Sequence, residues 1–411
     1  MSLPGRSRPR LAFISPVFLF PADAGGKIRT GNILRGLKGG AFDLTLVSPA
    51  SAEQSATWRQ SLQEVSDQFV GWAPTPARPR WQRVGQMLSD LPVNVASDRT
   101  PAALSAVAKL LEDSSFDLVV FDFVHAAVLR PANLKSASLC FTHNVEAEIF
   151  ARHAKTADNA VMRAVWRNQH RKMQRFEQRS LSAFDGVVAV SERDAQQFKA
   201  QGLTSVYPIP TGVDLDFFSW QPPPEAGPPT VVFTGSMDWE ANVDGVGYFL
   251  DEVWPQIRAA MPQARFVVIG RNPPAGLLAK GKLAGGVEFT GFVDDVRTHA
   301  RAAQAFVIPL RVGGGTRIKA FEAMAMGCPV VSTALGMEGL PVKPGEDFLL
   351  ADDAKALADS VLRLLQEPAL RMRLSQAARA CVESRFGHRV ASEVFERACL
   401  DTLDRFRQRR S

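Results

Sequence analysis

The chain has 411 residues, too many for one ordinary hydrophobic core, so we expect two domains. Its 46% hydrophobic and 22% charged residues are typical of a globular protein, and no stretch is apolar and long enough to span a bilayer. The net charge of +6 favours an anionic partner but does not choose among nucleic acid, lipid and phosphorylated substrates. Four scattered cysteines exclude a disulfide framework and fit a reducing compartment.

The N-terminal segment combines basic residues with an apolar run, as a secretory signal does. Ser15 and Pro16 interrupt that run, and no small-residue cleavage site follows it. We therefore expect a basic tail followed by a first core strand, not a signal peptide.

Short apolar strands alternate with helical segments along most of the chain. In chain order, the predicted strands cover 10–16, 42–48, 117–123, 137–143 and 185–191, then 229–235, 264–270, 287–292, 305–310 and 328–333. Such alternation predicts α/β domains whose parallel sheets are covered by helices on both faces.

A proline-rich stretch separates the two halves. Residues 217–229 read FFSWQPPPEAGPP, which continues neither a helix nor a central strand, so we interpret them as a linker. The predicted domains are then 1–216 and 230–385, followed by a terminal amphipathic helix over 386–411. Ligands of such sheets bind at the carboxyl ends of the strands.

The loop ADAGGKIRTGN after the first strand is a candidate binding site. It carries Gly25, Gly26, Lys27 and Arg29. The alternative is an ordinary surface loop, which its place at a strand's carboxyl end makes less attractive.

His143 in FTHNVE and Asp122 in VVFDFVHA each follow or end a predicted strand. A lone histidine in such a place is more often structural than catalytic. Asp122, at another strand end, is a further candidate.

A long helical stretch over 152–179 is strongly basic. Its cations are interleaved with Trp166 and Phe176, and the candidates for surface contact are Arg163, Arg167, Arg171, Lys172 and Arg175. Two interpretations stay open: a solvated helix face, or weak contact with an anionic membrane surface. We expect no nucleic acid partner, because no nucleic-acid motif accompanies the charge.

The segment VGGGTRIKAFEAMAMG, residues 312–327, joins two predicted strands through a glycine-rich turn and a helix. Glycines admit a ligand close to backbone N–H groups, and Arg317 and Lys319 supply charge for phosphate oxygens. Glu322 shares a helix face with Lys319 and suits a ribose diol. The pattern favours a nucleoside diphosphate over a turn with solvated charges. A dinucleotide fold would need an acidic residue after the next strand, and VVSTALG has none.

Residues 309–333, PLRVGGGTRIKAFEAMAMGCPVVST, resemble the donor-site signature of retaining, nucleotide-sugar-dependent glycosyltransferases of the family 4 type. FTHNVEAEIF, VVAVSERDAQQF, IPTGVDLDFF and VVFTGSMDWEANVDG are similar to other segments of that family, so the likeness covers nearly the whole chain. In detail the chain resembles the branch associated with exopolysaccharide and PEP-CTERM systems. The resemblance implies a GT-B fold: two doubly wound Rossmann-like domains facing a cleft, with the C-terminal helix crossing back to the first domain.

The resemblance also implies residue roles. Glu322 matches the glutamate that holds the donor ribose. His143 matches the active-site histidine that contacts the transferred sugar, with Asn144 and Glu146 as its expected supports. Gly25 and Gly26 match the glycine loop that reaches the donor phosphate and lines the acceptor pocket, where we expect Lys27 and Arg29 to attract a charged acceptor. The remaining expected donor-binding residues are Gly235, Gly314, Gly315, Thr316, Arg317 and Lys319.

Two departures from the family pattern stand out. The first glutamate of its pair is replaced by Gly314, so the backbone of 313–316 would have to take over its contacts. Ser236 stands where many members have an arginine, and no lysine follows nearby. We expect Arg317 and Lys319 to replace those two cations.

The resulting hypothesis is a hexosyltransferase that moves a sugar, with retention, from a nucleoside diphosphate sugar to a glycan or lipid-linked acceptor in exopolysaccharide or envelope synthesis. We expect it in the cytoplasm, peripheral on the inner face of the membrane. No cofactor and no metal are expected, since neither Asp294-Asp295 nor Asp352-Asp353 ends an apolar strand. Two alternatives stay open: a nucleotide-sugar isomerase of the same fold, and a catalytically silent nucleotide-binding partner. The sequence specifies neither the sugar, the base nor the acceptor.

Overall fold

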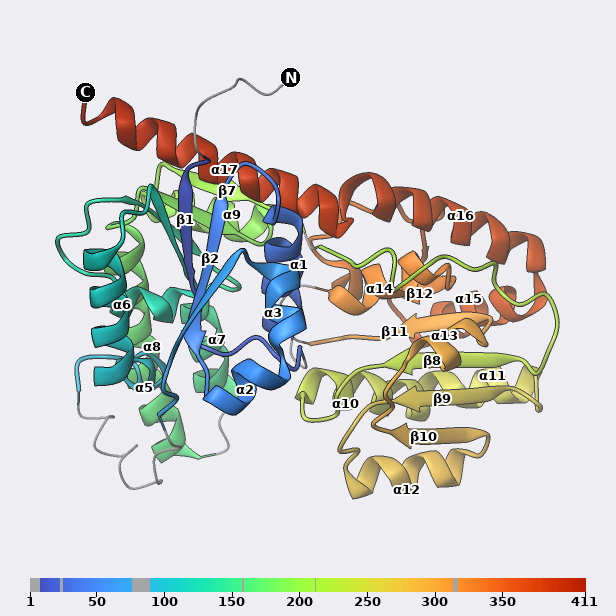
Figure 1. The fold of residues 1–411 in the computed structure, drawn as a ribbon. Coiled ribbons are helices and arrows are strands. Elements are labelled where there is room, and N and C mark those ends of the chain that lie inside the picture. Colours follow the sequence, from blue (N-terminus) through green and yellow to red (C-terminus); the bar gives the residue numbers. More distant parts are fainter. Residues whose placement is uncertain (1–7, 23–24, 76–88, 157–158, 211, 313–316) are drawn as a thin grey trace. The chain divides into compact units, whose positions relative to one another are not determined.

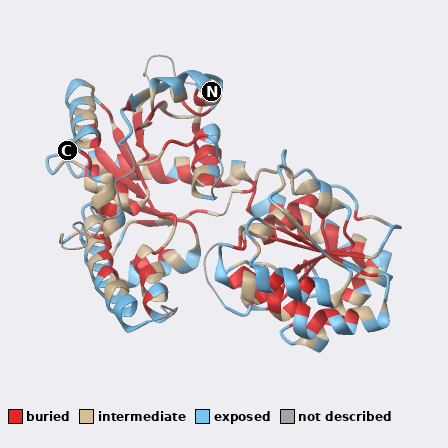
Figure 2. Ribbon diagram, turned by 90° about the horizontal axis from the view of Figure 1, so that it is seen from below, coloured by how far each residue is buried: buried red, intermediate tan, exposed pale blue. Residues whose placement is uncertain are grey.

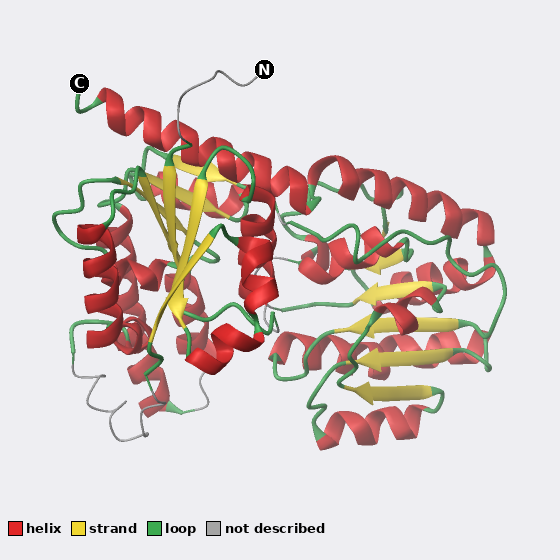
Figure 3. Ribbon diagram, in the orientation of Figure 1, coloured by secondary structure: helices red, strands yellow, loops and turns green. Residues whose placement is uncertain are grey.

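The computed structural model describes residues 8–22, 25–75, 89–156, 159–210, 212–312 and 317–411. The chain divides into two compact units, one made of Met1–Gly212 with His388–Ser411 and one made of Val213–Gly387. Each unit is an α/β layer structure with helices on both faces of a sheet (Figures 1 and 3). In each, the buried residues concentrate on the strands and on the inner faces of the helices (Figure 2).

The first unit contains a seven-stranded parallel sheet in the order β3-β2-β1-β4-β5-β6-β7. Its strands are β1 (Arg10–Ile14), β2 (Asp43–Pro49), β3 (Gln68–Trp72), β4 (Leu118–Asp122), β5 (Ala137–Phe141), β6 (Gly186–Ala189) and β7 (Val206–Pro208). Strands β4 and β5 run side by side with Asp122 opposite Phe141, so both end at the same edge of the sheet.

The helices of this unit follow the strands as expected for a parallel sheet. They are α1 (Gly25–Leu37), α2 (Ala52–Thr57), α3 (Arg59–Val65), α5 (Val93–Asp98), α6 (Pro101–Asp113), η1 (Val124–Leu129), α7 (Glu146–Thr156), α8 (Ala160–Leu181), α9 (Glu192–Ala200) and α17 (His388–Gln408). Several begin at a side chain that accepts a backbone N–H, for example Ser191 before α9 and Thr100 before α6.

The C-terminal helix α17 is part of the first unit, as the resemblance implied. Its Phe395 is fully buried, with its ring 6.3 Å from that of Phe13 and 5.0 Å from that of Phe141. Burying one phenylalanine contributes about 1.5–3 kcal/mol. Gly36 of α1 leaves room for Ser392, whose hydroxyl donates to the carbonyl of Asn32 at 3.3 Å.

The second unit contains a six-stranded sheet in the order β10-β9-β8-β11-β12-β13, also parallel. The strands are β8 (Thr230–Thr234), β9 (Arg265–Ile269), β10 (Val287–Gly291), β11 (Ala305–Ile308), β12 (Val330–Ser332) and β13 (Leu349–Leu350). The helices are α10 (Glu240–Tyr248), η2 (Phe249–Val253), α11 (Trp254–Ala260), α12 (Ala275–Ala284), α13 (Arg297–Arg301), α14 (Ile318–Met326), η3 (Leu335–Met337), α15 (Ala354–Gln366) and α16 (Pro368–Arg385).

The proline-rich stretch 217–229 lies inside the second unit, so it is not the linker that the sequence suggested. Trp220 packs beside Gly327, and its indole N–H donates to Ser375 Oγ at 2.9 Å. Arg371, which is 2% exposed, donates to the carbonyls of Pro224 and Glu225 at 2.9 and 3.0 Å. These bonds explain why a segment that cannot join a sheet still packs against a folded unit. The division falls instead between Gly212 and Val213, and again between Gly387 and His388.

Candidate functional site

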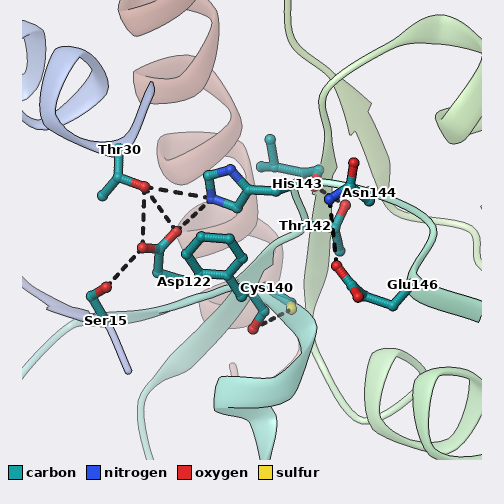
Figure 4. A network of polar contacts seen from close by, with 10 residues as sticks. Ser15, Thr30, Asp122, Cys140, Thr142, His143, Asn144 and Glu146 are labelled. Atoms are coloured by element: carbon teal, nitrogen blue, oxygen red, sulfur yellow. Dashed lines mark hydrogen bonds and ion pairs between the residues drawn. The ribbon is translucent and has the colours of Figure 1, made fainter. Parts of the chain in front are cut away.

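The first unit holds a buried polar network at the carboxyl ends of β1, β4 and β5 (Figure 4). Asp122 is fully buried, and three groups donate to its carboxylate: Ser15 Oγ at 2.9 Å, Thr30 Oγ1 at 3.1 Å and His143 Nε2 at 2.7 Å. Sequence reasoning had singled out Asp122 and His143 but not Ser15 or Thr30. The register of β4 and β5 brings the two predicted residues together.

His143 is held as a neutral ring with one nitrogen unused. It is 4% exposed, and its burial lowers its pKa, opposed by the charge and hydrogen bond of Asp122. Because Nε2 faces the Asp122 carboxylate, it carries the proton, and Nδ1 is left as an acceptor. Nδ1 is buried and has no hydrogen-bond partner among the described residues. An unpaired buried acceptor costs free energy unless a ligand supplies a donor.

Aromatic rings fix the orientation of His143. The Phe123 ring stacks on the His143 ring with centroids 3.9 Å apart, and it also stacks on His125 at 5.0 Å. Phe123 adopts a φ of 67°, an uncommon conformation for a bulky residue and a form of strain that is often found at functional sites. His125 is bonded to Asp98 at 2.5 Å.

The predicted glycine loop starts helix α1 beside this network. A Cβ on Gly26 would lie 2.7 Å from the Phe123 ring and 3.8 Å from His143 Nδ1, so only glycine fits against these rings. Lys27 is half-buried and donates to the carbonyl of Pro21 at 3.3 Å. Arg29 is 6% exposed, so its guanidinium lies inside the unit. Burial lowers the pKa of Arg29 to about 10, opposed by Asp194 and Asp122.

Asn144 and Glu146, the proposed supports of His143, belong to a second polar group at the start of α7. The Asn144 amide donates to Glu146 Oε1 at 3.4 Å, and the backbone N–H of Glu146 donates to Glu177 of α8 at 2.8 Å. Burial raises the pKa of Glu177 to about 8. Glu177 thus joins α8 to the amino end of α7, a role that sequence reasoning missed.

In the second unit, Lys319 reaches the carboxyl end of β8. Its Nζ donates to Asn242 Oδ1 at 2.7 Å, and the Asn242 amide donates to the carbonyl of Ser236 at 2.7 Å. A Cβ on Gly235 would lie 2.7 Å from Lys319 Nζ, so a side chain there would displace the ammonium from this position. The pKa of Lys319 is lowered to about 7. Burial is the main cause, the charge of Arg317 adds to it, and Glu322 opposes the shift.

Glu322 follows Lys319 on α14, and it is half-buried. Burial raises its pKa to about 7, and among the described residues no donor bonds its carboxylate. Arg317 is 3% exposed; its Nε donates to the carbonyl of Leu335 at 3.1 Å, and its Nη2 lies 3.7 Å from Glu338. Gly314, Gly315 and Thr316 lie outside the described residues, as does the rest of 313–316.

Arg271 is a cation at this site that sequence reasoning missed. It follows β9, and its Nε donates to Asp238 Oδ2 at 2.8 Å and to Ser236 Oγ at 3.3 Å. The sheet order places β9 beside β8, which brings Arg271 to the position of Ser236. The spacing of 35 residues between them gave no signal in the sequence.

The basic stretch forms α8, and its cations divide into two groups. Arg163, Arg167, Arg171 and Arg175 are exposed, with Arg179 continuing the same four-residue spacing. None of these five arginines has an ion pair among the described residues.

Three other residues of the stretch turn inward. Lys172 is half-buried and donates to the carbonyl of Ser89 at 2.6 Å. Trp166 and Phe176 pack against the cluster around Phe150 and Met173. Lys172 and the aromatic rings are therefore not part of the exposed surface that the sequence suggested.

The adjacent aspartate pairs have structural partners. Asp295 pairs with Arg297 at 2.7 Å, Asp352 accepts the backbone N–H of Ala334, and Asp353 caps α15. In the described part of the chain, no group of three or more His, Cys, Asp or Glu residues is placed to hold a metal ion. Nor does any described helix have the length and apolar character needed to cross a membrane.

Family models match both halves of the chain. Residues 25–217 match the model described as Glycosyltransferase Family 4, and residues 228–367 match the model described as Glycosyl transferases group 1. A phosphatidyl-myo-inositol mannosyltransferase of Mycobacterium leprae is 30% identical over 309 residues, covering 72% of this chain and 76% of that protein. A 44.6 kDa protein from the cps region of Klebsiella pneumoniae is 21% identical, covering 84% of this chain and 87% of that protein.

Solved structures share the fold at low sequence identity. Sucrose-phosphate synthase from Thermosynechococcus elongatus has a TM-score of 0.67 at 18% identity, covering 97% of this chain and 98% of that chain. HepE from Anabaena, solved with UDP and glucose, has a TM-score of 0.65 at 14% identity, covering 95% and 98%. These likenesses confirm the expected GT-B architecture of two Rossmann-like units.

Proposed function

Because the chain belongs to the family 4 glycosyltransferases, we propose that it transfers a hexose from a nucleoside diphosphate sugar to a hydroxyl of a glycan or lipid-linked acceptor. The observation that carries the donor assignment is the pair Lys319 and Glu322 on α14. A cation held at a strand's carboxyl end suits a diphosphate, and a carboxylate that no donor among the described residues bonds suits a ribose diol.

The diphosphate leaving group gains charge as the glycosidic bond breaks. Lys319 with its proton bound, and Arg317 close to it, offer positive charge in a largely desolvated place, where electrostatic stabilisation is strongest. In this proposal they take the part that a metal ion plays in other transferases, and no cofactor is needed. The backbone of Gly314, Gly315 and Thr316 remains the proposed contact for the transferred sugar.

In the first unit, His143 is a second proposed contact for the transferred sugar. Gly25, Gly26 and Lys27 form the proposed acceptor loop. The neutral ring of His143 presents Nδ1 as an acceptor for a sugar hydroxyl. Asp122 is not suited to deprotonate the acceptor, because it already accepts three hydrogen bonds. In this proposal Nδ1 of His143 is used to hold the transferred sugar, and transfer proceeds with retention, in which the departing phosphate takes the acceptor's proton.

The exposed arginines of α8 support a lipid-linked acceptor. These five arginines, Arg163 to Arg179, form a stripe along the helix at four-residue spacing. Like charges at that spacing repel one another, so the stripe does not stabilise the helix. The relative from Mycobacterium leprae is named for a phosphatidyl-myo-inositol substrate. We place the enzyme at the cytoplasmic face of the membrane, in exopolysaccharide or envelope glycan synthesis.

Incubation of the purified protein with UDP-, GDP- and ADP-sugars tests the proposal and separates it from the isomerase alternative. Transfer predicts that the nucleoside diphosphate is released only when a membrane lipid or glycan extract is added. An isomerase would instead convert the sugar nucleotide without acceptor. A catalytically silent partner would bind the nucleotide but show no turnover, whichever extract is added.

A further inference from the structure

Two cationic side chains converge on the dipeptide Gly235-Ser236 at the carboxyl end of β8. Lys319 comes from α14, and its Nζ lies 2.7 Å from the place of a Cβ on Gly235. Arg271 comes from the end of β9, and its Nε lies 3.3 Å from Ser236 Oγ. The backbone N–H of Met237 donates to the carbonyl of Arg271 at 3.0 Å, which locks the two strand ends together.

Asp238 orients Arg271. Its Oδ2 accepts Arg271 Nε at 2.8 Å and Ser236 Oγ at 2.9 Å, and its Oδ1 accepts the Asn272 amide at 2.9 Å. The hydrogen bonds from Asn272 and Ser236 lower the pKa of Asp238, so its carboxylate stays ionised at neutral pH. Arg271 uses only its Nε edge here, and its two Nη atoms have no partner among the described residues.

The backbone next to Arg271 is specially arranged. Asn272 adopts a φ of 58°, the left-handed conformation that asparagine tolerates better than most residues, and this turn returns its side chain to Asp238. An ion pair whose arginine is 60% exposed adds little to stability. Stability alone therefore does not account for three polar groups arranged around one arginine whose Nη fork stays open.

We propose that Arg271 binds the diphosphate of the donor together with Lys319, and so supplies the charge that Ser236 lacks. This inference rests on the proposed function and adds a binding residue to it. The two Nη atoms of an arginine match two phosphate oxygens in a planar, bidentate contact, whereas an ammonium acts as a point charge. The ligand class is a nucleoside diphosphate, bound where ligands of parallel sheets bind.

Three variants test the assignment. Arg271→Ala removes the fork. Arg265→Ala is the matched control, because Arg265 lies at the other end of the same strand and is a similarly exposed, ion-paired arginine, 3.0 Å from Glu288. The double variant with Arg271→Ala and Ser236→Arg removes the arginine that follows β9 and places one after β8, within the Gly235-Ser236 dipeptide.

Calorimetric titration with GDP, UDP and ADP, and with the matching monophosphates, gives the affinities. We expect Arg271→Ala to weaken diphosphate binding about tenfold or more, in line with lost hydrogen bonds to a charged group, and to affect the monophosphate less. We expect Arg265→Ala to bind like the unaltered protein. The double variant should recover most of the affinity, which a merely structural role for Arg271 would not allow.

The outcomes separate this inference from the function on which it rests. Unaltered diphosphate affinity in Arg271→Ala overturns the inference and leaves the donor site of Lys319 and Glu322 standing. An equal loss for diphosphate and monophosphate, with no recovery in the double variant, also overturns it, because Arg271 would then contact the ribose or base. If the unaltered protein binds none of the nucleotides, both the inference and the proposed function fail.

Discussion

At the scale of single residues, the donor site combines a lysine and a carboxylate that share a pKa near neutrality. The pKa of Lys319 is lowered to about 7 and the pKa of Glu322 is raised to about 7, in both cases mainly by burial. A bound diphosphate favours the charged ammonium, and a ribose diol donates best to an ionised carboxylate. The two requirements are met together only around neutral pH.

Donor affinity is therefore expected to be bell-shaped in pH. Above about pH 7 the free protein loses the Lys319 proton that the bound state needs, so affinity falls by up to about tenfold per pH unit. Below about pH 7 Glu322 gains a proton and affinity falls on the acid side. Titration with a nucleotide sugar measures this, since both of its phosphates are esterified and stay ionised. Lys319→Arg should flatten the alkaline limb, and an unchanged limb would contradict the assignment.

The ribose contact of Glu322 can be tested separately. Glu322→Gln keeps the shape of the side chain but removes its charge, and we expect donor binding to weaken by about 1–3 kcal/mol. Calorimetry at neutral pH measures the loss, with circular dichroism as the check on folding. An affinity within twofold of the unaltered protein would exclude the ribose role.

His143 is expected to position the sugar without acting as a base. Misplacing a reacting group by an ångström costs about 10²-fold, so His143→Ala should lower turnover by at least that factor. The pH–rate profile should keep its acidic limb, the fall in rate at low pH that protonation of a general base would cause, because no general base is lost. His170→Ala is a suitable control, since His170 is a half-buried histidine of the same unit that bonds only the carbonyl of Ala147 in the described residues. A lost limb would make His143 the base.

At the scale of elements, the sequence predicted the central strands well and the edge strands poorly. All ten predicted strands are present, because buried parallel strands are continuous apolar runs. Of the four edge strands only β10 was predicted. Strands β3 and β7 of the first sheet and β13 of the second were missed: β3 is partly exposed and contains Gly71, β7 has three residues and β13 has two. Edge strands carry less burial and so a weaker pattern.

Helix α8 presents a testable surface. Its arginines from Arg163 to Arg179 extend over about 24 Å at about 1.5 Å per residue. We expect salt-sensitive binding to anionic vesicles, at about 1 kcal/mol per well-placed arginine, measured by sedimentation. Changing Arg163, Arg167 and Arg171 to Gln should abolish it, while changing the ion-paired Lys355 and Arg363 to Gln should not. Equal binding by both variants would leave the stripe as a solvated face.

At the scale of the whole molecule, the resemblance predicted the architecture but not the residues that meet across a sheet. Arg317, Lys319 and Glu322 lie within one motif and could be found by spacing alone. Asp122 and His143 were found singly, as residues at strand ends, and only the register of β4 and β5 joins them. Arg271 could not be found, because its place depends on the order of β8 and β9 in the sheet.

Retention is the prediction that concerns the complete reaction. If the leaving phosphate takes the acceptor's proton, the first-formed product keeps the anomeric configuration of the donor. NMR of the new glycosidic linkage in that product decides the matter. An inverted product would require a general base, and His143 or Asp122 would then have to be re-examined in that role.

Binding of a nucleoside diphosphate by the folded protein tests the central claim most directly. A ligand that binds only the folded state raises its stability, by about 2.7 kcal/mol at a hundred times the dissociation constant. Thermal unfolding with UDP, GDP and ADP should show a clear rise in Tm with one of them, a smaller rise with its monophosphate and a reduced rise in Lys319→Met. An unchanged Tm with all three nucleotides at millimolar concentration would contradict the claim.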